Sequence, residues 1–175
     1  MPTTYTLIAS NTLSSSAASV TFSSIPATFT DLVLRTSVKN SRAFEYTPMK
    51  IDFNGLTTSI YSWRFMGAEG STLANDATSA TTYMDYPRSN GNNAGSANLF
   101  SNDEMYIPNY TSATKKPVRI FGVQEYNNTV SNMIKTTAGL IDITTAITSI
   151  TIAPQSATYN LLSGSSFFLY GIKNS

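Results

Sequence analysis

Apolar and polar residues alternate with a period of two along several short stretches of the chain. In TDLVLRTSVKN, Leu32, Leu34 and the methyl group of Thr36 fall on one side of an extended backbone, and Val33 and Arg35 fall on the other. Successive side chains of a strand point to opposite faces, so this spacing predicts a β-strand with one face toward a core.

The same alternation recurs in ASVTFSSIP, MKIDF, PVRIFGVQEY and AITSITIAP, with turn residues between the stretches. Asn54-Gly55 predicts a hairpin, because a type I′ turn needs positive φ at both central residues. A second turn is expected at Asn127-Asn128. The patterns predict about eight to ten strands and no convincing helix. We therefore expect an all-β fold over residues 1–175, a single antiparallel two-sheet sandwich that is jelly-roll-like.

The chain ends on an apolar run, GSSFFLYGIKNS, although the last residues of most domains are poorly ordered. This run is too short for a membrane-spanning helix and fits a strand covered on both faces. On one face, Phe168, Tyr170 and Ile172 need a cover, which we expect either from the segment around residues 67–97 or from another subunit. The C-terminal strand is therefore predicted to be an interior element of the fold.

Periodicity is lost between about residues 67 and 97, in GAEGSTLANDATSATTYMDYPRSNGNNAGSA. Irregular segments of this length are uncommon in compact domains and usually carry function or are disordered. The sequence predicts a long irregular insertion here. Tyr83, Tyr86 and Arg88 are its candidate contacts to a partner or a glycan, because recognition residues concentrate on loops of a rigid scaffold. The remaining aromatic residues are expected in the core or at a subunit interface.

Composition excludes several classes of function. Charged residues make up 12% of the 175 residues and the net charge is +1, so nothing favours binding to nucleic acid or to an anionic membrane. The chain contains no Cys and no His, which excludes disulfides, thiolate or imidazole metal ligands and Cys- or His-based catalysis. The N-terminus, MPTTYTLIAS, lacks the basic and long apolar regions of a secretory signal peptide.

The ten acidic residues are the remaining candidates for catalysis. A glycosidase needs two carboxyl groups roughly 5–10 Å apart across a cleft, and no acid stands in a recognisable setting of that kind. The adjacent Asp103 and Glu104 should point to opposite faces of a strand. NDATSATTYMD and SNDE are rich in oxygen ligands but lack the spaced acids of a calcium loop, and no phosphate-binding glycine motif is present. We expect no cofactor, no metal and no small-molecule substrate, and hence no enzyme.

Four stretches carry a resemblance to a known family: FSSIPATFTDLVLRTS, FNG followed by an aromatic strand, ITSITIAP and the closing GSSFFLYGIKN. Together they resemble small structural proteins and fibre-tip modules of tailed bacteriophages. The resemblance spans most of the chain, from Phe22 to Lys173, and leaves the 67–97 segment as its variable part. Its motifs are structural and carry no catalytic residues.

The resemblance implies a role in the virion. Met1 lies only a few residues before the first predicted strand, so we expect a stand-alone module, which suits a capsid decoration (cement) protein made in the host cytoplasm. Such a protein would bind the major capsid protein on the capsid surface and associate with itself, commonly as a homotrimer. The alternative is a tail-fibre or receptor-binding module that recognises host-surface glycans. A hydrolase that uses an unrecognised pair of carboxylates is the weakest hypothesis.

Overall fold

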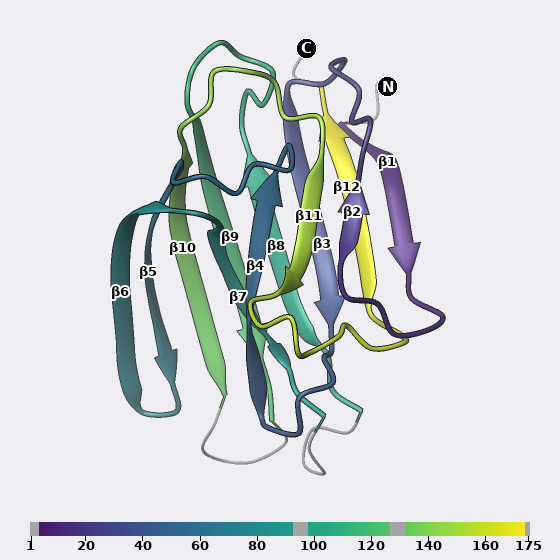
Figure 1. Ribbon diagram of the computed structural model, residues 1–175, viewed down its shortest axis with the longest axis vertical. Helices are drawn as coiled ribbons and strands as arrows, with labels where there is room; N and C mark the ends of the chain where they lie inside the picture. The colour runs from purple at the N-terminus through teal and green to yellow at the C-terminus, as the bar shows by residue number, and fades with distance from the viewer. Residues whose placement is uncertain (1–3, 93–97, 127–131, 174–175) are drawn as a thin grey trace.

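The structure is a computed structural model that describes residues 4–92, 98–126 and 132–173. The described residues form twelve strands in two antiparallel sheets that pack face to face, without a helix (Figure 1). This confirms the predicted all-β, two-sheet antiparallel sandwich. The larger sheet has the spatial order β1 (Tyr5–Thr12), β12 (Ser166–Ile172), β3 (Asp31–Val38), β8 (Ser101–Ile107), β9 (Lys116–Gln124), β10 (Met133–Ile141), β5 (Tyr61–Glu69) and β6 (Thr72–Thr81).

The second sheet has four strands and covers only part of the first. Its spatial order is β2 (Val20–Phe22), β11 (Ile150–Pro154), β4 (Tyr46–Phe53) and β7 (Met84–Asn90). Figure 1 shows this sheet lying over the middle of the larger one, with the β5–β6 hairpin extending beyond β4 and β7. The inner face of β6 is therefore left without a covering layer.

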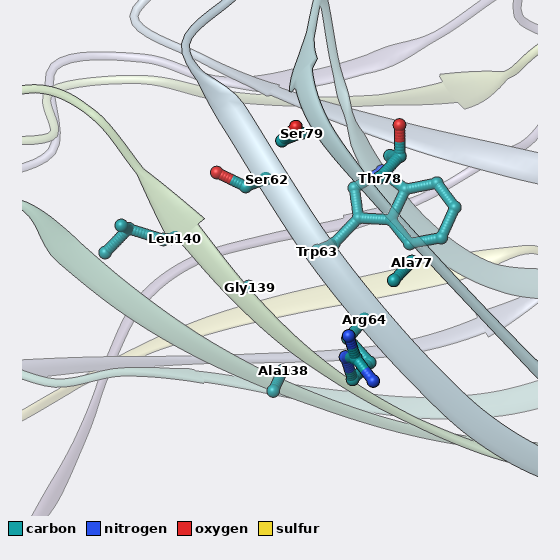
Figure 2. Close-up of a pocket in the computed structure, with 9 residues that line it drawn as sticks. All are labelled: Ser62, Trp63, Arg64, Ala77, Thr78, Ser79, Ala138, Gly139 and Leu140. Carbon is teal, nitrogen blue, oxygen red and sulfur yellow. The ribbon is translucent and has the colours of Figure 1, made fainter.

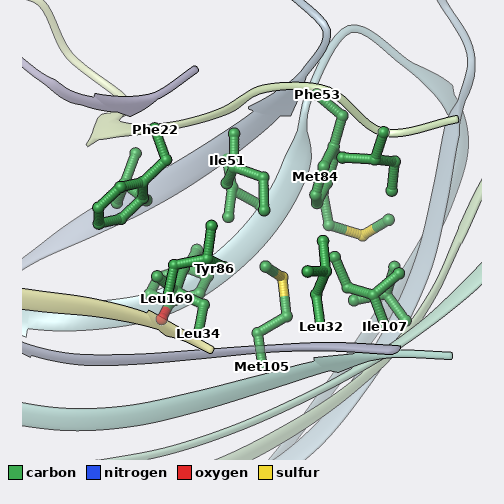
Figure 3. Close-up of a cluster of buried hydrophobic side chains, with 14 of the residues drawn as sticks. Phe22, Leu32, Leu34, Ile51, Phe53, Met84, Tyr86, Met105, Ile107 and Leu169 are labelled. Atoms are coloured by element: carbon green, nitrogen blue, oxygen red, sulfur yellow. The ribbon is translucent and has the colours of Figure 1, made fainter. Parts of the chain in front are cut away.

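The core lies where the two sheets overlap, and Figure 3 shows a part of it. The alternation along β3 predicts one buried face, and the structure confirms it: Leu32, Leu34 and Thr36 are buried and directed to the core. Val33, on the opposite face, is also buried, because its cross-strand neighbours Tyr106 and Tyr170 flank it on that face. The side chains labelled in Figure 3 come from both sheets. Phe22, Ile51, Phe53, Met84 and Tyr86 of the smaller sheet lie opposite Leu32, Leu34, Met105, Ile107 and Leu169 of the larger one.

The C-terminal strand is an interior element, as predicted. β12 pairs with β1 on one side and with β3 on the other. The expectation that the segment around residues 67–97 covers its outer face is wrong, because that segment lies at the opposite end of the sheet order. Neighbouring side chains give partial cover instead: the ring of Tyr5 meets that of Tyr170 edge to face at 6.3 Å, and the Arg35 guanidinium lies 5.9 Å from the centre of the Tyr5 ring.

Asn54 and Gly55 form the predicted turn but not the predicted hairpin. Both have positive φ, 54° and 66°, and the amide of Leu56 donates to the carbonyl of Phe53 at 3.0 Å. The strands on either side, β4 and β5, belong to different sheets, so residues 56–60 carry the chain from one layer to the other. The Asn54 side chain is held by hydrogen bonds to backbone groups of residues 146–149. The turn predicted at Asn127-Asn128 lies outside the described residues.

The prediction of an irregular insertion is wrong for residues 67–92, which contain the end of β5, all of β6 and all of β7. β6 shows no hydrophobic alternation because most of its side chains are exposed on both faces. β7 shows none because it is buried on both faces, with polar side chains inside. Ser89 and Asp85 are examples: Asn40 Nδ2 donates to Ser89 Oγ, and Lys135 Nζ donates to Asp85 Oδ2. Residues 93–97 of the predicted insertion lie outside the described residues.

Candidate interaction surface

The outer face of the larger sheet is apolar at the end formed by β9, β10, β5 and β6. Alternation along β10 assigns its side chains to the two faces: Met133, Lys135 and Thr137 are buried on the inner face, whereas Ile134 and Leu140 are exposed on the outer face. β10 therefore places a lysine on the inner face beside Met133, and two large apolar residues on the outer face, where a sandwich usually carries polar ones.

This outer face is hollowed along β10, β5 and β6, and we call the hollow the outer groove. Its central part has a volume of about 590 Å³, and a neighbouring part of about 520 Å³ lies toward one end of the strands. Figure 2 shows the latter part, where residues of three adjacent strands meet. Small side chains such as those of Ala77 and Ala138 leave the space between larger neighbours. The outer-face residues that define the groove are Ser62, Arg64, Met66, Ala68, Leu73, Asn75, Ala77, Arg119, Phe121, Ile134, Thr136, Ala138 and Leu140.

Strand register arranges the groove residues in rows across the sheet. Ile134 is the Cα partner of Ala68, which is in turn the partner of Leu73. In the next row, Phe121 and Met66 both flank Thr136. The side chain of Leu73 is 84% exposed and that of Met66 is 65% exposed. Large apolar side chains scattered singly are ordinary, but a contiguous group on one face marks an interaction site.

The row beyond the apolar group is basic. Arg119 donates to Glu104 Oε1 at 3.0 Å, and Arg35 donates to the other carboxylate oxygen of Glu104, also at 3.0 Å. Arg64 lies in the same row as Arg119, with Ala138 between them, and no carboxylate of the described residues is within ion-pair distance of its guanidinium. The groove therefore offers an apolar surface with positive charge along one border.

The inner face of β5 carries a pair of stacked aromatic residues. The rings of Trp63 and Phe65 are 6.0 Å apart with an interplanar angle of 26°, and Lys135 Nζ lies 4.1 Å from the centre of the Phe65 ring. Figure 2 shows Trp63 beside Thr78 of β6, its cross-strand partner. Met84 of β7 closes part of this face by packing against β10. These rings contribute to packing at the margin of the core, and the two residues also line the hollows that make up the outer groove.

The three residues predicted as partner or glycan contacts are not brought together. Tyr86 is 1% exposed in the core, its hydroxyl shares a 3.1 Å hydrogen bond with Thr36 Oγ1, and burial raises the pKa of its phenol well above the usual value. Tyr86 is therefore wrong as a contact residue. Arg88 is half-buried, donates to Glu69 Oε2 at 2.8 Å and lies 3.8 Å from the centre of the Tyr46 ring.

Tyr83 lies in the short connection between β6 and β7 and is not among the described residues that line the outer groove. Its backbone carbonyl accepts a 2.8 Å hydrogen bond from Thr81 Oγ1, and its side chain is half-buried. Three further tyrosines, Tyr61, Tyr110 and Tyr126, are buried. The expectation that aromatic residues fill the core is therefore confirmed for these three.

The buried carboxylates of Asp103 and Asp85 accept hydrogen bonds from neighbouring side chains of the fold. Asp103 points inward and Glu104 outward, as predicted. Asp103 Oδ2 accepts hydrogen bonds from Ser101 at 3.0 Å and from Thr36 at 3.2 Å, and burial raises the pKa of this carboxyl to about 8. Asp85 accepts from Lys135. Among residues 4–92, 98–126 and 132–173, no group of three or more acidic, His or Cys side chains could hold a metal ion.

Comparison with known protein families, with curated proteins and with solved structures found no match. Within the part of the chain that the structure describes, no helix is long and apolar enough to cross a membrane.

Sequence reasoning missed the outer groove because its signal depends on knowing which face of each strand is buried. In NMIKTTAGL the alternation of Ile134 and Leu140 with Lys135 and Thr137 was visible. Read by itself, it suggests that the isoleucine and the leucine face the core. Only the positions of the neighbouring strands show that Lys135 takes the inner side, where it meets Asp85.

Proposed function

We propose that this chain is a virion structural protein, a capsid decoration (cement) protein that binds the major capsid protein through non-covalent contacts on the capsid surface. Two lines of reasoning support the proposal. The first is the resemblance of the sequence motifs to small structural proteins of tailed bacteriophages. The second, which carries the argument, is the exposed apolar group of Met66, Leu73, Phe121 and Ile134 in the outer groove.

The composition of the groove fits a surface that binds another protein. The central parts of protein interfaces are enriched in aromatic residues, Met and Arg and are depleted of Lys and acidic residues. The groove presents Phe121, Met66, Arg64 and Arg119 in adjoining rows; among the described residues that line it, none is a lysine and Asp76 is the single acid. A protein that stabilises a shell by contact needs no reacting group. Because the shell repeats the same site many times, multivalent attachment makes modest affinity per site sufficient.

A rebinding experiment tests the proposal. The protein is released from purified particles with mild denaturant, and purified wild type and variants are added back to the stripped shells. We expect wild type to rebind at high copy number and the double variant Phe121→Ser/Met66→Ser to bind at least about tenfold more weakly, because buried apolar anchors dominate interface energy. Leu7→Ser, at the opposite end of the same sheet face, is the matched control and should bind like wild type.

Two outcomes would contradict the proposal. Wild type that fails to bind stripped shells argues against capsid decoration itself. Wild type that binds while Phe121→Ser/Met66→Ser binds equally well argues against the outer groove as the contact surface. The tail-fibre alternative predicts a different distribution: a few copies confined to the tail, together with binding to host-surface glycans.

A further inference from the structure

A sandwich of two open sheets has four edge strands, and here these are β1 and β6 of the larger sheet and β2 and β7 of the smaller one. An edge strand presents a row of backbone N–H and C=O groups that can pair with a strand of another chain. Natural proteins protect such edges with short strands, bulges, proline or charged side chains. The four edges of this protein differ in how well they are protected.

Three of the edges carry such a device. β1 is interrupted by a register shift between Leu7 and Ala9. β2 is only three residues long. β7 contains Pro87, and its pairing with β4 shifts register between Thr47 and Met49.

β6 is the least protected of the four, because its one register shift lies near an end of the strand. From Thr72 to Thr78 it pairs with β5 in continuous register, and the irregularity of that pairing comes only after Thr78. Among the described residues, β5 is its one neighbouring strand. The stretch TLANDAT contains no proline and no Lys or Arg, and Asp76 is its single charge. Most of its side chains are exposed on both faces, with Leu73 at 84%.

We propose that β6 pairs antiparallel with β6 of a second copy of this chain, around a two-fold axis at Asn75. The regular stretch from residue 72 to residue 78 is centred on Asn75, so this register uses its whole length. Thr72 then faces Thr78 of the second copy, and Leu73 faces Ala77. Cross-strand Thr–Thr and apolar pairs stabilise antiparallel sheets.

The same register separates the only charges on the edge. Asp76 faces Ala74 of the second copy, and the two Asn75 amides face each other, where each can donate and accept. A register shifted to place the axis at Asp76 would set two carboxylates directly opposite, which destabilises a strand pair. The sequence of β6 is therefore self-complementary about Asn75, and this is why the occupant is a second copy and not a strand of another protein.

A two-fold axis perpendicular to the sheet keeps both outer faces on one side. The two outer grooves then lie next to each other across the joined β6 strands, with Leu73 of each copy near the junction. The isologous contact closes on itself, so it makes a dimer and not a fibre. The trimer that the family resemblance implies would need a different surface. This pairing does not depend on the proposed role in the capsid.

Sedimentation equilibrium of the purified full-length chain tests the pairing. We expect wild type to associate to twice its monomer mass of 18.9 kDa. Asn75→Lys sets two lysines opposite each other and should raise the dimer Kd about tenfold. Asn75→Glu should do the same. Asn11→Lys places the same change on the exposed edge strand β1 and should leave the dimer Kd unchanged.

Mixing the variants gives the sharper result. Because residue 75 faces itself in the proposed register, an equimolar mixture of Asn75→Lys and Asn75→Glu should form heterodimers at least as tight as the wild-type dimer. Circular dichroism confirms that each variant is folded. The proposal is overturned if wild type stays monomeric at its highest soluble concentration, if it forms trimers, or if mixing fails to restore dimers. These results use no capsid, so they leave the outcome of the rebinding experiment untouched.

Discussion

The two ends of the larger sheet differ in what covers their inner face. β12, β3, β8 and β9 lie beneath the four-stranded sheet, whereas β6 extends beyond it (Figure 1). In the covered part, every second position of β9 is buried, and the positions between them are exposed or half-buried. In the uncovered part, β6 has no buried side chain. Hydrophobic alternation therefore reports a strand only where one face is buried, and a strand without such a face looks like a loop in the sequence.

Removal of the C-terminal strand should have the largest effect, because β12 lies inside the covered part. We expect deletion of residues 167–175 to abolish the soluble, cooperatively folding protein. The deletion removes the buried side chains of Phe167 and Leu169 and leaves β1 and β3 without their shared neighbour. Expression and thermal melting measure the result. A truncated protein that still melts cooperatively would contradict the assignment of β12 to the core.

The ion pair of Lys135 and Asp85 joins β10 to β7, and its strength shows how well the smaller sheet shields β10 from water. Lys135→Met should lower the free energy of unfolding by about 3–5 kcal/mol, because it leaves the buried carboxylate of Asp85 without its partner. Urea denaturation measures this cost. The double variant Lys135→Met/Asp85→Leu should recover most of the loss, since no uncompensated charge then remains inside. A cost below about 1 kcal/mol for Lys135→Met would show that the pair is solvated.

A matched pair of leucines compares the covered and uncovered parts directly. Leu34→Ala should cost about 2–5 kcal/mol, because this side chain is fully buried between the sheets. Leu73→Ala, on the exposed strand β6, should change the free energy of unfolding of the monomer by no more than about 0.5 kcal/mol. Chemical denaturation at low protein concentration measures both. Equal costs would mean that the two parts are buried alike.

Asp103, in the covered part of the larger sheet, should make the free energy of unfolding depend on pH. Burial raises the pKa of Asp103 from 3.8 to about 8, against the opposing effects of hydrogen bonds from Ser101 and Thr36 and of the charge on Lys135. Between these pH values the folded state holds a proton that the unfolded state has released. The stabilisation of the folded state by this proton on Asp103 is complete below about pH 4. As the pH rises toward 8, the free energy of unfolding falls by about 1.4 kcal/mol per pH unit.

Asp103→Asn keeps the size of the side chain and removes the titration, so it should flatten this dependence between pH 5 and pH 8, the range that the raised pKa defines. Urea denaturation across this pH range gives the slopes. An unaltered slope in Asp103→Asn would show that the carboxyl group is ionised in the folded protein.

The sequence predicted those parts of the fold whose physical signal is local. Alternation in β3 correctly identified a buried face with Leu32 and Leu34, and the apolar C-terminal run correctly indicated an interior strand. Asn54-Gly55 correctly indicated a turn, because positive φ is a property of the residues themselves. That the turn joins two layers and not two paired strands depends on the contacts of Asn54 with residues 146–149, which are distant in the sequence.

The candidate surface could not be predicted in the same way. The choice of Tyr83, Tyr86 and Arg88 rested on an irregular segment, and that segment proved to contain an exposed strand and a strand buried on both faces. The outer groove depends on which side of β10 faces the smaller sheet, and that side is determined by the whole topology. Polar residues inside, such as Lys135, reverse the simple reading of the pattern.

An electron cryomicroscopy map of the intact particle that carries this chain would show directly which surface of the protein contacts the shell. We predict many copies on the capsid shell, with the outer groove, including Met66 and Phe121, turned toward a capsid subunit. Density for this chain only in the tail, or a groove that faces solvent on every copy, would contradict this prediction.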